Sequence, residues 1–322
     1  MATLEDVAEK AGVSVITVSR VINSPEKVKP ETRERIRHIM DELGYSPNFA
    51  AKALVRKKTG IIDVYIPAAI NLSNPFVMHF ISGISEVLST HMYSFLILRD
   101  RSVDHACDGY IATGLLKNEI RDMYQYAKKR KRPLVLFGHT DSLDVDYVDV
   151  DNVKGAKDIT EYLISMGHRK IAMINVDEDK DYTVDRLIGY QQALAESGID
   201  VHDNTVVYAR NNVQGGYDVT KELIRQRDVT GIFCATDTLA LGAVRAITGL
   251  GLRVPEDISI AGFDGLGHHL LTNPQITTVQ QPIFEIGRML AKTLLDRIEG
   301  IDGRTQRLVK PSLIINQSVA RI

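Results

Sequence analysis

The chain has 322 residues, of which 44% are hydrophobic and 25% are charged, and its formal net charge is −2. This length excludes a single small helical unit, and the composition is typical of a soluble globular protein with two or three domains. Two distant cysteines, Cys107 and Cys234, exclude a disulfide-built scaffold and indicate a reducing compartment. No apolar run approaches membrane-spanning length, and no signal peptide precedes the first predicted helix. We therefore expect a cytoplasmic protein without membrane contact.

The charge is unevenly distributed along the chain. Residues 1–60 contain 11 Lys and Arg against 8 Asp and Glu, whereas the remainder contains 28 against 33. A basic start on an acidic body indicates that only the start of the chain meets a polyanion. An excess of three positive charges is too small to identify DNA by itself.

The first two dozen residues have the spacing of two short helices joined by a tight turn. Apolar residues recur at helical intervals over Leu4–Ala11, Thr3 and Asp6 are placed as a near capping box, and Gly12 ends the helix. Ser14 is placed to cap a second helix. Two helices joined by a glycine-containing turn form a helix-turn-helix, whose second helix can enter the major groove of DNA. An ordinary helical hairpin has the same spacing, so this pattern alone leaves both readings open.

A third helix and a basic segment follow. Pro30 opens the third helix, which is predicted to run to Leu43 and to end at Gly44. The next segment, residues 49–58, is helix-prone and rich in Lys and Arg. A ten-residue helix is not stable alone, so we expect it to be ordered only by contact with another partner. Its charge points to phosphates, and docking on the following domain is the alternative.

From Ile61 onward, predicted strands alternate with predicted helices, which is typical of parallel α/β sheets. Two sets of about five strands predict two similar lobes, with a small ligand bound between them at the carboxyl ends of the strands. The predicted strands are 61–66, 93–98, 109–112, 134–137 and 147–150, then 170–175, 205–208, 231–235, 259–263 and 277–279. The predicted helices are 76–90, 152–166, 185–197, 216–225, 238–250 and 283–298.

Short motifs occur in one order along nearly the whole chain. They are Leu4–Ser14 with Thr17–Asn23, Gly44–Asn48, Ala51–Leu54, Asn74-Pro-Phe76, Val150-Asp-Asn152, Gly167–Ile171, Ala235-Thr-Asp237, Val254–Ile258, Gly262-Phe-Asp264 and Thr277-Thr-Val279. With a helix-turn-helix, a basic linker and a double α/β body in this order, the chain resembles the lactose-repressor (LacI/GalR) family of bacterial transcription regulators. The resemblance favours the DNA-binding interpretation of the first helices over the simple hairpin.

The resemblance implies a domain plan and a function. It implies a three-helix DNA-binding domain at 1–48, a hinge helix at 49–59, and at 60–322 a two-lobed, periplasmic-binding-protein-like α/β core that dimerises and binds an effector. The N-lobe would span about 60–151 and 283–310, and the C-lobe about 152–282 and 311–322. Such a homodimer would repress carbohydrate-utilisation genes from a palindromic operator on double-stranded DNA, and a small sugar would release it.

The resemblance also assigns residues to DNA contacts. Base edges would be read by Val15, Ile16 and Arg20, of which Arg20 can donate two hydrogen bonds to guanine. Phosphates would be contacted by Ser14, Thr17, Ser19 and Asn23, which fix register without reading sequence. In the hinge, Ala51, Lys52, Leu54 and Arg56 would enter the minor groove, with Leu54 wedged into a base step.

Effector contacts are expected at eight positions. Many sugar-binding relatives carry an aromatic residue where this chain has Asn211. A stacking platform is therefore either absent or supplied by Phe76, Phe137 or Tyr182. Asp237 could equally cap the following helix, and His139 could be an ordinary loop histidine. The expected effector residues are Asn74, Phe76, His139, Arg186, Asn211, Thr236, Asp237 and Asp264.

One connection departs from the family pattern. Only nine residues, Arg99–Cys107, lie between the predicted strand that ends at Leu98 and Asp108, which directly precedes the next strand, whereas the family usually has a full helix there. We expect this helix to be truncated or lost, which would leave one face of the N-lobe sheet less covered.

The run Lys128–Arg132 ends a predicted helix, where positive charge is favourable without a ligand. No metal site, cofactor site or catalytic constellation is found in the sequence, so we expect neither an enzyme nor a cofactor. A sugar-binding receptor without regulatory role fits the body but not residues 1–23. Control by a phosphorylated partner protein instead of a sugar remains open.

Overall fold

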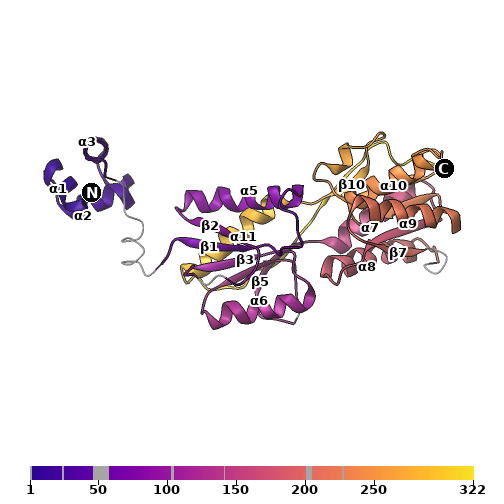
Figure 1. Cartoon of the computed structure of the whole chain (residues 1–322), viewed down its shortest axis with the longest axis horizontal. Helices are drawn as coiled ribbons and strands as arrows, with labels where there is room; N and C mark the ends of the chain where they lie inside the picture. Colours follow the sequence, from indigo (N-terminus) through magenta and orange to yellow (C-terminus); the bar gives the residue numbers. More distant parts are fainter. Residues whose placement is uncertain are drawn as a thin grey trace. The chain divides into compact units, whose positions relative to one another are not determined.

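The computed structural model describes residues 2–23, 25–45, 58–102, 105–140, 142–200, 205–226 and 228–322 (Figure 1). The chain divides into two compact units, Met1–Gly60 and Ile61–Ile322, and each is described by itself. The predicted hinge residues Ala51, Lys52, Leu54 and Arg56 lie outside the described residues. No helix in the described part of the chain is long and apolar enough to cross a membrane.

The first unit begins with the predicted pair of helices. The capping box is present: the Thr3 hydroxyl oxygen accepts from the Asp6 backbone N–H at 3.2 Å, and the Asp6 carboxylate accepts from the Thr3 N–H at 2.8 Å. Gly12 ends the first helix with a φ of 62°, a conformation that glycine adopts at low cost. The helices of this unit are α1 (Leu4–Ala11), α2 (Val15–Asn23), the short 3-10 helix η1 (Pro25–Lys27) and α3 (Pro30–Glu42).

A small core joins these helices. Val7 of α1, Val18 of α2 and Ile36 of α3 are fully buried against one another. An ion pair of 2.8 Å between Lys10 and Glu42 links α1 to α3 at the surface. The inward side of α2 is thereby fixed, and its opposite side faces outward.

The second unit contains two six-stranded sheets, one in each lobe. Among the described residues of this unit, all strand pairs are parallel except β10 with β12, which is antiparallel. The first sheet, in spatial order, contains β11 (Gln306–Val309), β5 (Asp146–Val150), β4 (Leu134–Phe137), β3 (Gly109–Ala112), β1 (Ile61–Tyr65) and β2 (Ser94–Leu98). The second contains β12 (Ser312–Ile314), β10 (Thr277–Gln280), β9 (Ser259–Asp264), β8 (Gly231–Cys234), β6 (Ile171–Val176) and β7 (Val206–Ala209).

Helices cover these sheets and form the cores. In the first lobe, α5 (Pro75–Thr90) and α11 (Ile283–Ile298) cover one face of the sheet and α6 (Lys117–Lys129) covers the other (Figure 1). In the second lobe, α7 (Asn152–Ser165) packs on α8 (Asp181–Glu196), and α9 (Val213–Gln226) packs on α10 (Asp237–Gly249). A short 3-10 helix, η3 (His268–Leu270), follows β9. The chain passes between the sheets after β5, after β10 and after β11, so the prediction of two α/β lobes is confirmed.

The expected loss of one crossover helix is confirmed in the residues described between β2 and β3, which are 99–102 and 105–108. As a consequence, the edge strand β2 is poorly covered, with Leu96 45% and Ile97 38% exposed. Helix α8 begins four residues before the predicted Asp185. Its first turn contains Asp181, whose negative charge is favourable at a helix N-terminus. This earlier start matters for the site, because it places Tyr182 on the same helix as Asp185.

Candidate functional site

Helix α2 presents an outward surface made of the residues predicted to read DNA. Val15 is 40% and Ile16 64% exposed, and Arg20 is exposed as well, while Val18 of the same helix is fully buried. Two exposed aliphatic side chains next to an exposed arginine can offer contacts to thymine methyl groups and to guanine. The base contacts remain predictions. The exposure of these three side chains is what such contacts require.

The start of α2 is fixed by Ser14. Its hydroxyl accepts from the Thr17 backbone N–H at 3.3 Å and lies 2.9 Å from the Thr17 hydroxyl. Both side chains are therefore held at the N-terminus of the helix, where backbone N–H groups also favour phosphate. Ser19 is half-buried on the same helix. Asn23 belongs to α2, and its side chain lies outside the described residues.

A cavity of about 180 Å³ lies in the second unit at the carboxyl ends of the strands of both sheets. Its wall is partly aromatic, and several charged and amide side chains point to it. These features agree with the expectation of a small-molecule site between the lobes. Among the lining residues are Asn74, Phe76, Thr113, Phe137, Asp149, Asn152, Lys180, Asp181, Tyr182, Arg186, Asn211, Thr236, Asp264 and Gln281.

Arg186 is the central cation of this cavity, although it is only 3% exposed. Its Nε atom donates to the Asn152 side-chain oxygen at 2.9 Å, and its Nη1 atom donates to the Ala235 carbonyl. The guanidinium lies 3.7 Å from the ring centroid of Phe263 and 4.7 Å from that of Tyr182. Hydrogen bonds and ring contacts thus hold the arginine in one orientation, which lowers the entropy that a ligand must remove on binding.

Asp264 lies beside this arginine, with 3.7 Å between its Oδ1 atom and the Arg186 Nη1 atom. The same oxygen accepts from the Gln281 side-chain amide at 2.7 Å. Burial raises the pKa of Asp264 to about 6, and the arginine opposes that rise. Asp264 also has a φ of 131°, a rare conformation for a residue other than glycine. Such strain costs roughly 1–3 kcal/mol and is concentrated at functional sites.

The aromatic wall comes from three separate elements. Phe76, at the start of α5, stacks on Phe80 with ring centroids 5.8 Å apart, and it lies 5.3 Å from Phe137 at the end of β4. Tyr182 reaches the cavity from α8. Asn74 caps α5 by accepting from the Phe76 N–H at 2.9 Å, and this cap fixes both residues at the cavity. All three aromatic residues named as possible stacking platforms therefore line the cavity.

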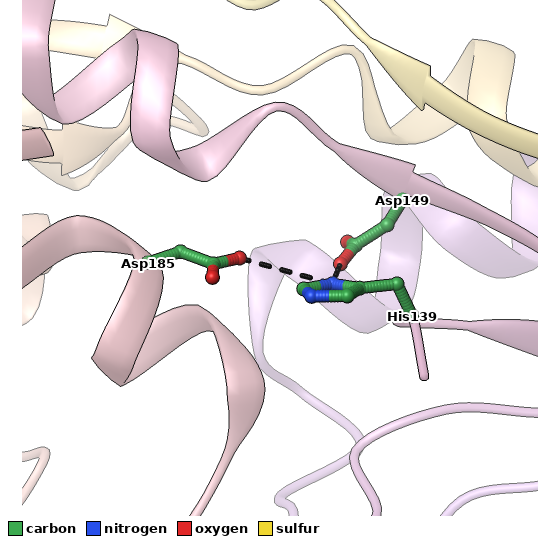
Figure 2. Close-up of side chains that lie close together, drawn as sticks. All are labelled: His139, Asp149 and Asp185. Carbon is green, nitrogen blue, oxygen red and sulfur yellow. Dashed lines mark hydrogen bonds and ion pairs between the residues drawn. The ribbon is translucent and has the colours of Figure 1, made fainter. Parts of the chain in front are cut away.

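His139 does not line the cavity itself but lies in a charged cluster with Asp149, which does line it, and with Asp185 of the other lobe (Figure 2). Its Nδ1 atom is 3.0 Å from an oxygen of Asp149 on β5 and 3.7 Å from an oxygen of Asp185 on α8. The hydrogen bond with Asp149 is the main reason that the pKa of His139 rises to about 9. Burial raises the pKa of Asp185 to about 6. We call these three residues the interlobe cluster.

Comparison with known proteins gives the family. Residues 3–48 match the lacI family of bacterial regulatory proteins, and residues 160–319 match the periplasmic binding protein-like domain. An uncharacterized HTH-type transcriptional regulator of Bacillus subtilis, YvdE, is 36% identical over 99% of both chains. The HTH-type transcriptional regulator CelR of Thermobifida fusca is 35% identical over 98% of both chains. The chain belongs to the lacI family.

Solved structures of relatives agree with this assignment. A CelR–cellobiose complex is similar over 99% of this chain and all of that one, with a TM-score of 0.75 and 32% identity. The lac repressor dimer bound to operator and the anti-inducer ONPF is similar over 99% of both chains, with a TM-score of 0.81 and 26% identity. The relatives of this lacI-family chain named above are DNA-binding transcriptional regulators.

Two predicted effector residues, His139 and Asp237, are not among the residues that line the cavity, and Asp237 has a structural role instead. Asp237 is fully buried and accepts from the Thr278 hydroxyl at 2.6 Å and from the Gly265 N–H at 2.8 Å. Burial raises its pKa well above the ordinary value. The helix cap that the sequence allowed for Asp237 is supplied by Thr236, whose hydroxyl accepts from the Leu239 N–H at 3.2 Å. Asp237 therefore joins α10 to the turn after β9 and to β10.

Several cavity residues of this lacI-family chain were not predicted from the sequence. By contrast, Asn211 and Thr236 were predicted, and both line the cavity, where the Thr236 hydroxyl donates a hydrogen bond to the Asn211 side-chain oxygen at 2.8 Å. The missed residues lie at or just after the ends of strands or at the starts of helices, so treating every predicted strand end and helix start as part of the cavity would have found most of them. They are Thr113, Asp149, Asn152, Lys180, Asp181 and Gln281.

Proposed function

We propose that the chain is a dimeric DNA-binding repressor of carbohydrate-utilisation genes, which leaves a pseudo-palindromic operator when a small sugar binds between its lobes. The observation that carries the proposal is the presence, in one chain, of an exposed α2 surface and a cavity with both aromatic and hydrogen-bonding walls. We propose the cytoplasm as its location, since operator DNA lies there.

The cavity supports a sugar as the effector. Sugar hydroxyls need planar donors and acceptors, which Arg186, Asp264 and Asn152 supply, and a sugar ring needs an apolar face, which Phe76 and Tyr182 supply. Two relatives bind sugars in their solved structures: CelR binds cellobiose, and a LacI-family regulator of Enterococcus faecium, 27% identical with a TM-score of 0.73, binds ribose.

The DNA side of the proposal assigns three roles. Val15, Ile16 and Arg20 read base edges, while Ser14, Thr17, Ser19 and Asn23 contact phosphates and fix register. Two hinge segments of a dimer enter the minor groove at the operator centre, where Leu54 of each wedges into a base step and Ala51, Lys52 and Arg56 flank it.

Sugar binding releases DNA because it favours one arrangement of the lobes. A ligand shifts such an equilibrium only by its difference in affinity for the two arrangements. The coupling is reciprocal, so operator DNA must lower sugar affinity by the factor by which sugar lowers DNA affinity.

Fluorescence anisotropy with a labelled operator tests the proposal. The purified chain is titrated onto its palindrome, without and with each of a panel of monosaccharides and disaccharides at fixed salt. One sugar is expected to lower operator affinity by about 5–150-fold, the usual range of allosteric coupling. A sugar that binds but leaves operator affinity unchanged would contradict induction. If only a phosphorylated partner protein from lysate changes operator affinity, control by that partner replaces the proposal.

A further inference from the structure

The interlobe cluster brings three metal-binding atoms together from three separate elements. His139 follows β4, Asp149 lies on β5, and Asp185 lies on α8 of the other lobe. One ligand atom of each residue lies within 4.8 Å of the other two. Figure 2 shows both carboxylates directed at the same side of the imidazole. The cluster is largely shielded from solvent, since the three side chains are 21%, 5% and 16% exposed.

The distances fit one bound ion. Zinc binds imidazole nitrogen and carboxylate oxygen at about 2.0–2.2 Å, so two ligand atoms of a tetrahedral ion lie roughly 3.4 Å apart. The two distances from the His139 nitrogen, 3.0 Å and 3.7 Å, bracket that value. The ligand atoms of Asp149 and Asp185 lie within 4.8 Å of each other.

The charges also fit a divalent cation. Two ionised carboxylates and a neutral imidazole supply two negative charges to a divalent cation in a largely shielded place, and the neighbouring Arg186 and Asp181 contribute charges of opposite sign. Imidazole combined with carboxylates suits zinc and its neighbours among the transition metals better than calcium or magnesium, which prefer oxygen ligands alone.

One ligand is already oriented. The second carboxylate oxygen of Asp149 accepts from the backbone N–H of Val150 at 2.7 Å, so this side chain is held before any ion binds. Such secondary hydrogen bonds fix ligands in metal sites. Asp149 also lines the cavity, which places the cluster next to the site of the small-molecule ligand.

We propose that the interlobe cluster binds one divalent transition-metal ion of the zinc class and that the ion joins the two lobes. Binding transfers the proton on the His139 nitrogen to solvent, and the ion takes its place between the imidazole and the two carboxylates. Since the ligands come from both lobes, an ion bound there favours the arrangement in which they are close. Binding of the ion to this cluster requires neither DNA nor a sugar.

Direct titration tests it. The full chain, purified without a histidine tag and freed of metal with a chelator, is titrated with Zn²⁺ by calorimetry and with Co²⁺ by visible absorption. One ion per chain is expected, with the absorption bands of cobalt bound to nitrogen and oxygen ligands. A chain that binds no ion at micromolar metal would overturn the proposal and leave the cluster as a protonated ion triad only.

Variants locate the ion. His139→Ala and the nearly isosteric Asp185→Asn should each lower Zn²⁺ affinity at least tenfold and abolish the rise in Tm that Zn²⁺ gives the wild type. His105→Ala is the matched control, because His105 pairs with Asp63 at 2.8 Å in the same lobe and is not in the metal-capable group. It should bind Zn²⁺ as the wild type does. Equal affinity in Asp185→Asn and wild type, with both folded by circular dichroism, would place the ion elsewhere and contradict the proposal.

Discussion

The Nη1 atom of Arg186 lies 3.7 Å from the Oδ1 atom of Asp264, at a separation where the two charges attract while each side chain keeps its own hydrogen bonds. Arg186 is held by Asn152, and Asp264 is held by Gln281. The pair therefore presents a cation and a carboxylate side by side in the cavity, in fixed positions. A ligand with adjacent hydroxyl groups can accept from one and donate to the other.

Replacing Asp264 tests the role of this pair. Asp264→Asn keeps the shape of the side chain and removes its charge, so a sugar hydroxyl loses a charge-assisted hydrogen bond worth about 1.5–3 kcal/mol. Sugar affinity, measured by calorimetry, is expected to fall tenfold or more. Operator affinity without sugar should stay at the wild-type value, so the variant should resist release by sugar.

The control for this variant is Asp257→Asn, since Asp257 is an exposed aspartate of the same unit that pairs with Arg253. It should bind sugar as the wild type does. Wild-type sugar affinity in Asp264→Asn would remove Asp264 from the effector site.

Arg20 is expected to be the residue of α2 that discriminates most strongly between operator bases. Arg20→Ala should lower affinity for the cognate operator by about 1–3 kcal/mol for each half-site and hardly change affinity for a scrambled duplex, because a bidentate contact to guanine discriminates between bases. Anisotropy titrations on both duplexes at one salt concentration measure the ratio. The free energy of unfolding should be unchanged, since the side chain is exposed.

Arg35→Ala provides the matched control, because it removes the same charge from an exposed position on α3. It should weaken both duplexes to a similar extent, as loss of a phosphate contact or of general charge does. If Arg20→Ala behaves in the same way, Arg20 contacts phosphate and does not read a base.

The elements of the fold were predictable wherever burial shapes the sequence. The run Ile171–Val176 is buried along its whole length and has the continuous apolar sequence of a central parallel strand. Strand β11, at Gln306–Val309, was not predicted, because it lies at the sheet edge and its first three residues are exposed. Its pairing with β5 is a contact between segments about 160 residues apart, which no local pattern contains.

The cavity was predictable in part for the same reason. Asn74 and Asp264 stand in motifs at a helix start and a strand end, where parallel sheets place ligand sites, and Arg186 was assigned by the family resemblance. The contact of His139 with Asp185 was not predictable from the sequence, because it depends on how the two lobes approach each other. Asp237 shows that a motif can also mislead. It stands in a family motif next to a cavity residue, yet its carboxylate accepts hydrogen bonds from Thr278 and Gly265 inside the protein.

Stability is expected to depend on pH through His168. This histidine is almost fully buried; its Nε2–H donates to the Ala320 carbonyl at 3.1 Å, and its Nδ1 accepts from the Thr230 hydroxyl at 2.9 Å. Burial lowers its pKa below the ordinary 6.5. As the pH falls below 6.5, His168 binds a proton in the unfolded chain but stays neutral in the folded chain. The contribution of His168 to the free energy of unfolding therefore falls until its folded pKa is passed, while the raised pKa values of His139, Asp185 and Asp264 act in the opposite direction.

Urea denaturation at pH 7.5 and pH 5.5 measures this effect. His168→Gln should be less stable than wild type at pH 7.5 but should lose less stability between the two pH values. His79→Gln, at an exposed histidine of α5, should keep the wild-type pH dependence. An unchanged pH dependence in His168→Gln would assign the acid sensitivity to other groups.

The close contact of α5 with α11 depends on two glycines. A Cβ at Gly83 would lie 2.0 Å from the backbone oxygen of Phe284, and a Cβ at Gly287 would lie 2.5 Å from that of Phe80. Gly83→Ala must therefore push two helices apart, and these helices carry much of the N-lobe core. We expect a loss of about 1–3 kcal/mol or more in the free energy of unfolding, measured by urea denaturation, because overpacked cores shift backbone as well as side chains.

Gly249→Ala, in the last turn of α10, is the control, since the nearest atom would be 3.7 Å away in ordinary contact. There the better helix propensity of alanine should leave stability equal or higher by up to about 1 kcal/mol. A wild-type urea midpoint in Gly83→Ala would mean that α5 and α11 can separate without loss, and that their spacing does not limit the stability of this lobe.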